Sequence, residues 1–157
     1  MKIFRFIRQE NLDELSREAK AVSRLRKNLN FHQRDESLCN RLLNAVEPDS
    51  YIPPHRHLDQ EKDETMILLR GRLGVIFFDE KGNIAQTAVL SPGGAAVGVN
   101  IPHGEFHTVV SLESGTVFFE SKAGPYRALT VEERAPWAPG EGSDESDAYL
   151  AELRKIW

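Results

Sequence analysis

The sequence contains a single cysteine, Cys39, among 157 residues. One cysteine cannot form a disulfide within the chain, and such scarcity is typical of proteins in a reducing compartment. Long hydrophobic runs are also missing, because no stretch of about 18 apolar residues is present to span a membrane. The N-terminus, MKIFRFIRQENL, interleaves basic residues with Ile and Phe and lacks the apolar core of a signal peptide. We therefore expect a cytoplasmic protein without a membrane partner.

Positive charge is in shorter supply than negative charge. Lys and Arg number 20 against 24 Asp and Glu, a net charge of -4, which gives no reason to expect nucleic acid as a partner. The charge is uneven, with six bases and one acid between Arg17 and Arg34, and six acids and one base between Glu132 and Asp147. Both segments can simply be solvated. Alternatively, the basic segment helps to hold an anionic ligand such as a phosphate or a carboxylate.

Length and composition indicate one domain. At 157 residues, 40% of them hydrophobic and 28% charged, the chain is long enough for one ordinary core and too short for two. NLDELSREAKAVSRL repeats apolar residues on one helical face, with Asn11 as its cap. DESLCNRLLNAV predicts a second short helix over residues 35–46, capped by Asp35.

After this predicted helix the pattern changes to successive strands. Segments rich in Val, Ile, Phe and Thr recur between turn sequences such as DEKGN, SPGG and ESG. The predicted strands are SYIPPHRH, TMILLRG, RLGVIFFD, IAQTAVL, AAVGVNIP, FHTVVSL and TVFFESK. Many short strands without intervening helices predict a β-sandwich or barrel, here over residues 46–127. A helical and extended segment over 1–45 precedes it, and an acidic, Pro/Gly-rich tail over 128–157 follows, with a short helix at DAYLAELRKIW.

Polar side chains alternate along RLRKNLNFH. Arg24, Arg26, Asn28, Asn30 and His32 occupy every second position, so an extended segment would place all five on one face. Such a face suits the lining of a ligand cavity, where the first four could grip phosphate or sugar hydroxyl groups. The alternative is that the preceding helix continues to about residue 28 and the alternation is accidental.

Two histidines one residue apart, His55 and His57, follow two prolines. On a strand, residues i and i+2 project from the same face, so both imidazoles can reach one ion while Arg56 points away. Glu64 opens the next predicted strand, and His107 begins a later one after the PHG turn. Three imidazoles and one carboxylate form a nitrogen and oxygen set suited to a divalent ion such as Fe, Mn, Ni, Zn or Co.

This layout resembles the two cupin sequence motifs, G-x5-H-x-H-x3,4-E-x6-G and G-x5-P-x-G-x2-H-x3-N. The matching residues are His55, His57, Glu64, Gly71, Pro102, Gly104 and His107. The leading glycine of the first motif is absent. Six residues separate His57 from Glu64, so Glu61 fits the spacing from the histidines and Glu64 fits the spacing to Gly71. We choose Glu64 because a strand register is fixed, whereas a loop can absorb two extra residues.

Residues 1–127 resemble, more specifically, the WbuC family of cupin-fold metalloproteins. The segments that carry this resemblance are RLRKNLNFH, LLNAVEPDSYIPPHRH, KDETMILLRGRLGVIFFDEKG and IPHGEFHTVVSLESGTVFFESKAGPY. It implies a single-domain cupin, a small jelly-roll β-barrel with an N-terminal helical segment. It further implies that His55, His57, Glu64 and His107 bind one divalent metal ion, which is Fe, Mn, Ni or Zn. A homodimer and an association with O-antigen and other surface-polysaccharide genes are implied as well.

The function expected first is that of a metal-dependent isomerase, epimerase or dioxygenase acting on a small carbohydrate or nucleotide-sugar. His32 and Glu120 are the available general bases. Lys122 shares a strand face with Glu120, and Tyr126 lies near the expected mouth of the barrel, so both are candidates for substrate contact. One alternative is a non-catalytic cupin that binds a metal or a sugar. Another is a metal-free barrel resembling sugar ketoisomerases, in which the histidines act as acids and bases.

Overall fold

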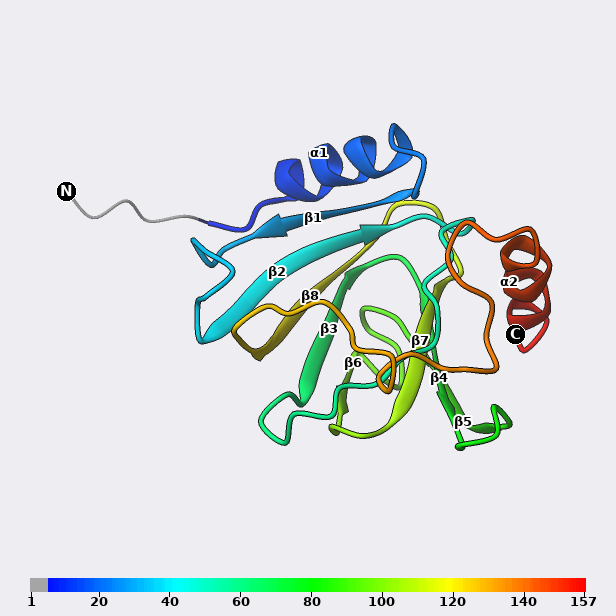
Figure 1. Cartoon of the computed structure of the whole chain (residues 1–157). Coiled ribbons are helices and arrows are strands. Elements are labelled where there is room, and N and C mark those ends of the chain that lie inside the picture. Colours follow the sequence, from blue (N-terminus) through cyan, green and yellow to red (C-terminus); the bar gives the residue numbers. More distant parts are fainter. Residues whose placement is uncertain (1–5) are drawn as a thin grey trace.

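The structure is a computed structural model and describes residues 6–157. Within this range the chain forms two helices and eight strands. Their bounds are α1 (Gln9–Lys20), β1 (Arg26–Asn30), β2 (Cys39–Val46), β3 (Glu64–Arg70), β4 (Leu73–Phe78), β5 (Ile84–Leu90), β6 (Gly98–Ile101), β7 (Phe106–Ser111), β8 (Thr116–Ala123) and α2 (Ser146–Arg154). The helices therefore lie at the two ends of the chain, and the strands occupy its middle (Figure 1).

The strands form two antiparallel sheets, one with the order β1-β2-β8-β3-β6 and one with the order β5-β4-β7. Apolar side chains from both sheets meet in one buried cluster, for example Met66 and Phe118 from the larger sheet and Val75 and Val109 from the smaller. The sheets thus pack face to face, with the core between them. This arrangement confirms the mainly β, single-domain jelly-roll fold that was expected.

Strand β2 is buried on both faces. Leu42 and Val46 face the interior of the barrel, whereas Leu43 and Ala45 pack beneath α1 in a cluster with Leu12 and its neighbours. Because apolar residues therefore stand at successive positions, the period of two is masked in the sequence. The helix predicted over residues 35–46 is wrong for this reason.

Two further boundaries differ from expectation. The cap of α1 is Arg8, and Asn11 lies at the third helical position, where its Oδ1 accepts a hydrogen bond from the Arg8 N–H at 2.9 Å. The sheet begins at Arg26, so the boundary expected at residue 45 falls inside β2. Because β1 pairs with β2 along its whole length, the alternating segment is extended over residues 26–30, as one of the two sequence hypotheses required.

The C-terminal tail covers the outer face of the smaller sheet. The predicted terminal helix is present as α2, and its Leu150 and Leu153 are buried against Ile76, Phe78 and other residues of that sheet. The Pro/Gly-rich connector before α2 contributes a tilted ring stack between Trp137 and Phe78 at 4.8 Å between centroids. Apolar burial therefore holds the tail to the barrel.

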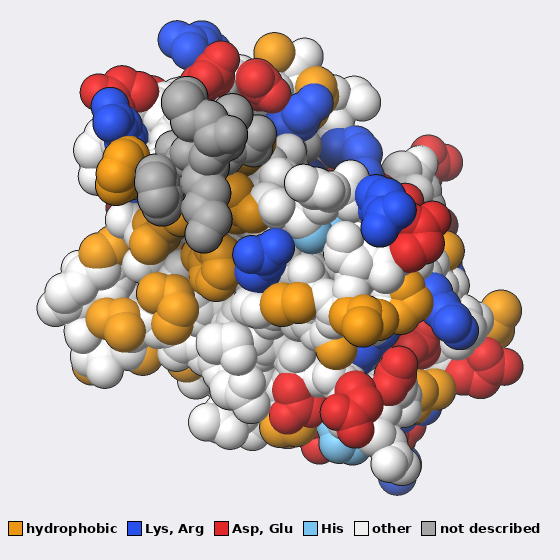
Figure 2. Space-filling model, turned by 90° about the vertical axis from the view of Figure 1, so that its left-hand side faces the viewer, with side chains coloured by type: hydrophobic (Ala, Val, Ile, Leu, Met, Phe, Trp, Pro, Cys, Tyr) orange, Lys and Arg blue, Asp and Glu red, His pale blue; other side chains and the backbone are white. Residues whose placement is uncertain are grey.

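The surface mixes side-chain types. Figure 2 shows hydrophobic side chains lying between Lys, Arg, Asp and Glu side chains across one face of the molecule, as is common for protein surfaces. Neither helix in the described part of the chain has the length and apolar character needed to cross a membrane.

Candidate metal centre

His55 and His57 lie on the extended loop between β2 and β3. The expected strand there is reduced to isolated bridges from His55 to Arg134 and to His107. In the bridge to His107, the His55 N–H donates to the His107 carbonyl at 3.0 Å and the His107 N–H donates in return at 2.9 Å. This pair of bonds places the ring centroids of His55 and His107 4.7 Å apart, with the His57 ring 5.5 Å from His55. Arg56 points the other way, as predicted, and stacks on the Phe106 ring at 4.2 Å.

Glu64 provides the carboxylate at the centre of this group. Its Oε1 lies 2.8 Å from His57 Nε2, and its Oε2 lies 3.1 Å from His107 Nε2. Lys122 Nζ also donates to Oε1 at 2.7 Å. Burial alone would raise the pKa of Glu64, but the hydrogen bonds with His107 and His57 and the charge of Lys122 outweigh it and hold the pKa well below its usual range. Glu64 is therefore a buried carboxylate anion.

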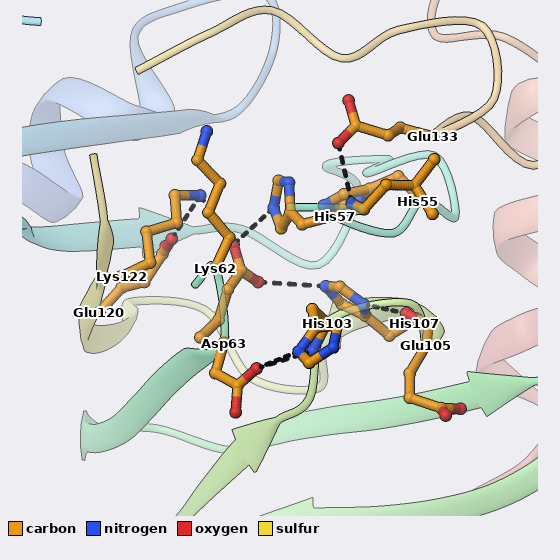
Figure 3. A network of polar contacts seen from close by, with 12 residues as sticks. His55, His57, Lys62, Asp63, His103, Glu105, His107, Glu120, Lys122 and Glu133 are labelled. Atoms are coloured by element: carbon orange, nitrogen blue, oxygen red, sulfur yellow. Dashed lines mark hydrogen bonds and ion pairs between the residues drawn. The ribbon is translucent and has the colours of Figure 1, made fainter. Parts of the chain in front are cut away.

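The hydrogen bonds of the Nδ1 atoms show which nitrogen of His55 and His107 is free to bind a metal ion. His55 Nδ1 donates to the Pro53 carbonyl at 2.9 Å. His107 Nδ1 donates to the Glu105 carbonyl at 2.8 Å (Figure 3). In a neutral imidazole the lone pair is then on Nε2. Backbone carbonyls hold metal-binding histidines in this tautomer. The His107 lone pair faces a Glu64 oxygen, and this contact is favourable only with a proton or a cation between them.

The protonation state of His55 fits the same role. Burial, with a smaller effect of His107, lowers the pKa of His55 to about 3. The ring is therefore neutral near pH 7, which is the form that binds a metal ion. One ligand atom each of His55, His57 and Glu64 lies within 4.8 Å of the others, so these three residues could hold a metal ion.

The four expected ligands are thus brought together, but not equally. His107 contacts the Glu64 carboxylate while its ring centroid lies 6.4 Å from that of His57, and it falls outside the tightest group of three. The competing carboxylate, Glu61, is exposed on the loop before β3. The structure therefore places Glu64, and not Glu61, beside the histidines.

A buried chain of polar groups continues from Glu64. Lys122 Nζ lies 2.8 Å from Glu120 Oε1 (Figure 3). Asn44 Nδ2 donates to Glu120 Oε2 at 2.9 Å. Burial disfavours the charged form of Lys122, but the carboxylates of Glu120 and Glu64 outweigh it and raise the pKa of Lys122. Lys122 is therefore a half-buried cation between two carboxylates.

This polar chain, His55 and His107 open onto a cavity of about 490 Å³. Its apolar wall consists of Val46, Ile52, Met66, Val109 and Phe118, and its polar wall of Arg24, Arg26, Lys27, Asn28, Asn44, His55, Glu64, His107, Glu120, Lys122 and Tyr126. Most of the expected substrate-contacting residues lie here. Asn30 and His32 instead line an adjoining cavity, which Glu120 and Lys122 also reach. His32 Nδ1 accepts a hydrogen bond from the Arg41 N–H at 3.2 Å, which ties the ring to β2.

The sequence did not single out three polar residues near the cavity. The sequence pattern predicts a helix around Asn44. In a strand, Asn44 shares a face with Leu42 and Val46, two positions away on either side, and so lies on the inner face of the barrel. Lys62 is buried in the loop before Glu64, and its Nζ donates to the Pro125 carbonyl at 3.1 Å. Glu141 comes from the acidic tail and binds Arg24 and Arg26. No local sequence signal marks the contact between Glu141 and Arg24, because 117 positions separate the two residues.

Lowering the pH is expected to weaken the Glu141 ion pairs. The hydrogen bond from Arg24, opposed by burial and reinforced by Arg26, lowers the pKa of Glu141 from the usual 4.5 to about 2. The resulting stabilisation is present above about pH 4.5 and is lost as the pH falls toward 2, because the unfolded chain takes up the proton first. Since the group is about a third exposed, it contributes less than about 1 kcal/mol.

Urea unfolding of the wild type and Glu141→Gln at pH 7 and pH 3 checks this expectation. The difference in unfolding free energy between the two proteins should shrink by more than half at the lower pH. An equal difference at both pH values would contradict it.

Facing antiparallel sheets around a histidine and carboxylate group define a cupin-fold protein, and solved structures share the fold. KdgF from Halomonas sp. is similar at a TM-score of 0.50 and 17% identity, over 65% of this chain and 82% of that chain. A conserved protein of unknown function from Streptococcus pyogenes is similar at a TM-score of 0.53 and 10% identity, over 81% of this chain and 93% of that chain. A cupin superfamily protein from Desulfitobacterium hafniense has a TM-score of 0.49 and 13% identity, over 62% of this chain and 76% of that chain.

The chain belongs to the family described as "Domain of unknown function (DUF6016)", whose model matches residues 7–90, more than half of the sequence. The matched range includes His55, His57 and Glu64 and ends before β6. A search among curated proteins finds no match to this chain. The narrower resemblance to the WbuC family therefore stays a prediction, within a cupin fold that is established.

Proposed function

We propose that this protein is a metal-dependent cupin enzyme of the isomerase, epimerase or oxygenase type. Its substrate is a small carbohydrate or nucleotide-sugar, and its setting is the cytoplasmic synthesis of a surface polysaccharide, by a homodimer. His55, His57, Glu64 and His107 hold one divalent ion, which is Fe, Mn, Ni or Zn. The observation that carries the proposal is the clustering of His55, His57 and Glu64 ligand atoms within 4.8 Å, with His107 Nε2 3.1 Å from the same buried carboxylate, at the wall of a cavity.

The chemistry follows from the groups around this centre. When bound, a divalent ion polarises a substrate oxygen and acidifies bound water. Lys122 is held as a cation and can donate a hydrogen bond to a developing negative charge on the substrate. Glu120, fixed by Asn44 and Lys122, is the nearest candidate for a general base, and His32 in the adjoining cavity is the second.

The size and lining of the cavity support a small polar substrate. A volume of about 490 Å³ lies within the roughly 300–1,000 Å³ range of small-molecule sites. The amides of Asn28 and Asn44 can bind hydroxyl groups, while Ile52 and Phe118 form part of an apolar wall that excludes water from one side. This division suits a sugar, which has polar edges and an apolar face.

One observation favours a metal-free alternative. Lys122 already places a positive charge 2.7 Å from Glu64, so the carboxylate has a cationic partner within the chain itself. In this second function the barrel is a sugar isomerase without a metal, and the histidines exchange protons with the substrate.

Elemental analysis of protein purified without an affinity tag separates the two functions. We expect close to one Fe, Mn, Ni or Zn per chain, and its loss in the His55→Ala/His57→Ala double variant. The matched control is His103→Ala, because His103 is an exposed histidine outside the group and should leave the metal content unchanged. A wild-type protein without stoichiometric metal would overturn the metal-dependent proposal and favour the metal-free isomerase.

A further inference from the structure

Arg24 and Arg26 together bind the carboxylate of Glu141. Arg24 Nε and Nη2 donate to Glu141 Oε1 and Oε2 at 2.8 and 2.9 Å, which is the bidentate geometry in which a guanidinium recognises a carboxylate. Arg26 Nη2 adds a third contact to Oε1 at 2.8 Å. Two guanidinium groups on one carboxylate are more than a surface ion pair usually has.

Arg26 is held in place independently of Glu141. The Arg26 side chain is only 14% exposed, and its Nη1 donates to the Tyr51 carbonyl at 3.1 Å and to Ser50 Oγ at 3.3 Å. Leu25, between the two arginines, has a φ of 53°, a left-handed conformation that is unusual for a residue other than glycine. Backbone strain of this kind persists where the surrounding structure fixes it, often at binding sites.

The same arginines face the metal centre. Both line the 490 Å³ cavity together with His55, Glu64 and His107, and both line the outer groove in which Glu141 lies. They therefore stand between the central cavity and the tail. A ligand that occupies the cavity can reach their guanidinium groups.

Glu141 lies on a segment that can move away. Glycines flank it on both sides, and no described atom lies within 4 Å of the position that a Cβ would occupy on Gly140 or Gly142. Close packing therefore does not fix this short stretch, and glycine leaves its backbone free to rearrange. The hydrogen bond from the Tyr51 hydroxyl to the Pro139 carbonyl, at 2.8 Å, anchors the chain just before it.

We infer that Arg24 and Arg26 form a subsite for a ligand carboxylate and that Glu141 is its internal occupant, displaced when the ligand binds. The inference rests on the proposed function, which places a sugar in the adjoining cavity, and narrows the substrate class to a sugar acid. The carboxylate is preferred over other anions because the two guanidinium groups already hold one in bidentate geometry. Glu141 thus competes with the ligand and weakens its apparent affinity.

Calorimetric titration with glucuronate tests the displacement, with glucose as the uncharged probe. Glu141→Gln should bind glucuronate about three- to fivefold more tightly than the wild type, because the competing charge is gone. Asp144→Asn is the matched control, since it removes the same charge from an exposed residue three positions further along, and it should change the affinity less than twofold. Arg24→Gln should weaken glucuronate binding at least tenfold, and glucose should show none of these differences.

Two further measurements distinguish failure of this inference from failure of the proposed function. Hydrogen exchange of the wild-type backbone over residues 139–143 should rise when glucuronate is added. Metal content, measured in every variant, should be unaffected by Glu141→Gln, so a wild type without metal would refute the proposed function while leaving the competition measurable. Unchanged or weaker glucuronate binding by Glu141→Gln, or exchange over residues 139–143 that does not respond to glucuronate, would overturn the inference.

Discussion

Replacing Glu64 with glutamine is expected to weaken metal binding more than any other single carboxylate substitution in this chain. Glutamine keeps the size of the side chain but removes the charge that a divalent ion needs. Loss of a group that merely orients a ligand costs roughly 10- to 100-fold in metal affinity, so loss of the central carboxylate should cost at least about 100-fold. Chelator competition, followed by elemental analysis of the dialysed protein, measures the effect.

Glu61→Gln is the matched control for this prediction. Glu61 lies only three positions earlier but is exposed on the loop, away from His57 and His107. It should retain wild-type metal affinity. Equal losses in the two variants, or a larger loss for Glu61→Gln, would show that the loop rearranges on metal binding and that the wrong carboxylate has been assigned.

The thermal stability of Glu64→Gln has to be measured alongside. The substitution also leaves Lys122 with Glu120 as its one remaining carboxylate contact of the two seen here. A half-buried cation that loses one of its carboxylate partners destabilises the fold. If Glu64→Gln still unfolds cooperatively but binds no metal, the loss of metal is due to the missing carboxylate and not to unfolding of the protein.

Much of the candidate metal centre could be predicted because its signals are local. The spacing of His55 and His57 directs both side chains to one side even though the segment is a loop, because an extended backbone alternates whether or not it pairs along its length. Glu64, Met66 and Leu68 show the alternation of β3 directly, with one face buried and Thr65 exposed. In such segments the sequence pattern and the burial agree.

Other features could not be predicted from local patterns. Strand β2 lies between the barrel interior and α1, so burial on both faces removes the alternation by which strands are recognised. The contact between Arg24 and Glu141 joins the two ends of the domain. Opposite charge in the two segments was visible, but charge alone does not specify which residues pair. The burial of β2 on both faces and the pairing of Arg24 with Glu141 both depend on the tertiary structure.

Gly71→Ala is expected to lower the free energy of unfolding by roughly 3 kcal/mol or more. Gly71 has a φ of +82°, where a residue with a Cβ is strained. The added methyl group would also lie 2.3 Å from Thr116 Oγ1 and 2.8 Å from Thr116 Cα. Thr116 is fully buried, and its hydroxyl donates to the Glu113 carbonyl at 2.7 Å, so moving it breaks a buried hydrogen bond. Urea unfolding at pH 7 measures the change.

Gly93→Ala separates the two causes of this effect. Gly93 has a similar φ of +74°, but no described atom lies within 4 Å of its added Cβ. Only the backbone strain of about 1–2 kcal/mol should appear there. If both variants lost the same stability, the contact with Thr116 would contribute nothing.

Gly71 is the glycine that ends the first of the two cupin motifs, and its position in the fold explains its role there. Gly71 joins β3, which begins at Glu64, to β4, and it packs against the first residue of β8, the strand that carries Glu120 and Lys122. The motif glycine thus lets two strands bearing polar groups of the centre approach closely at one corner. Gly71→Ala should accordingly reduce stability while the folded fraction still binds metal, the opposite of the result expected for Glu64→Gln. Loss of metal from folded Gly71→Ala would mean that this corner sets the geometry of the ligands as well as the stability of the barrel.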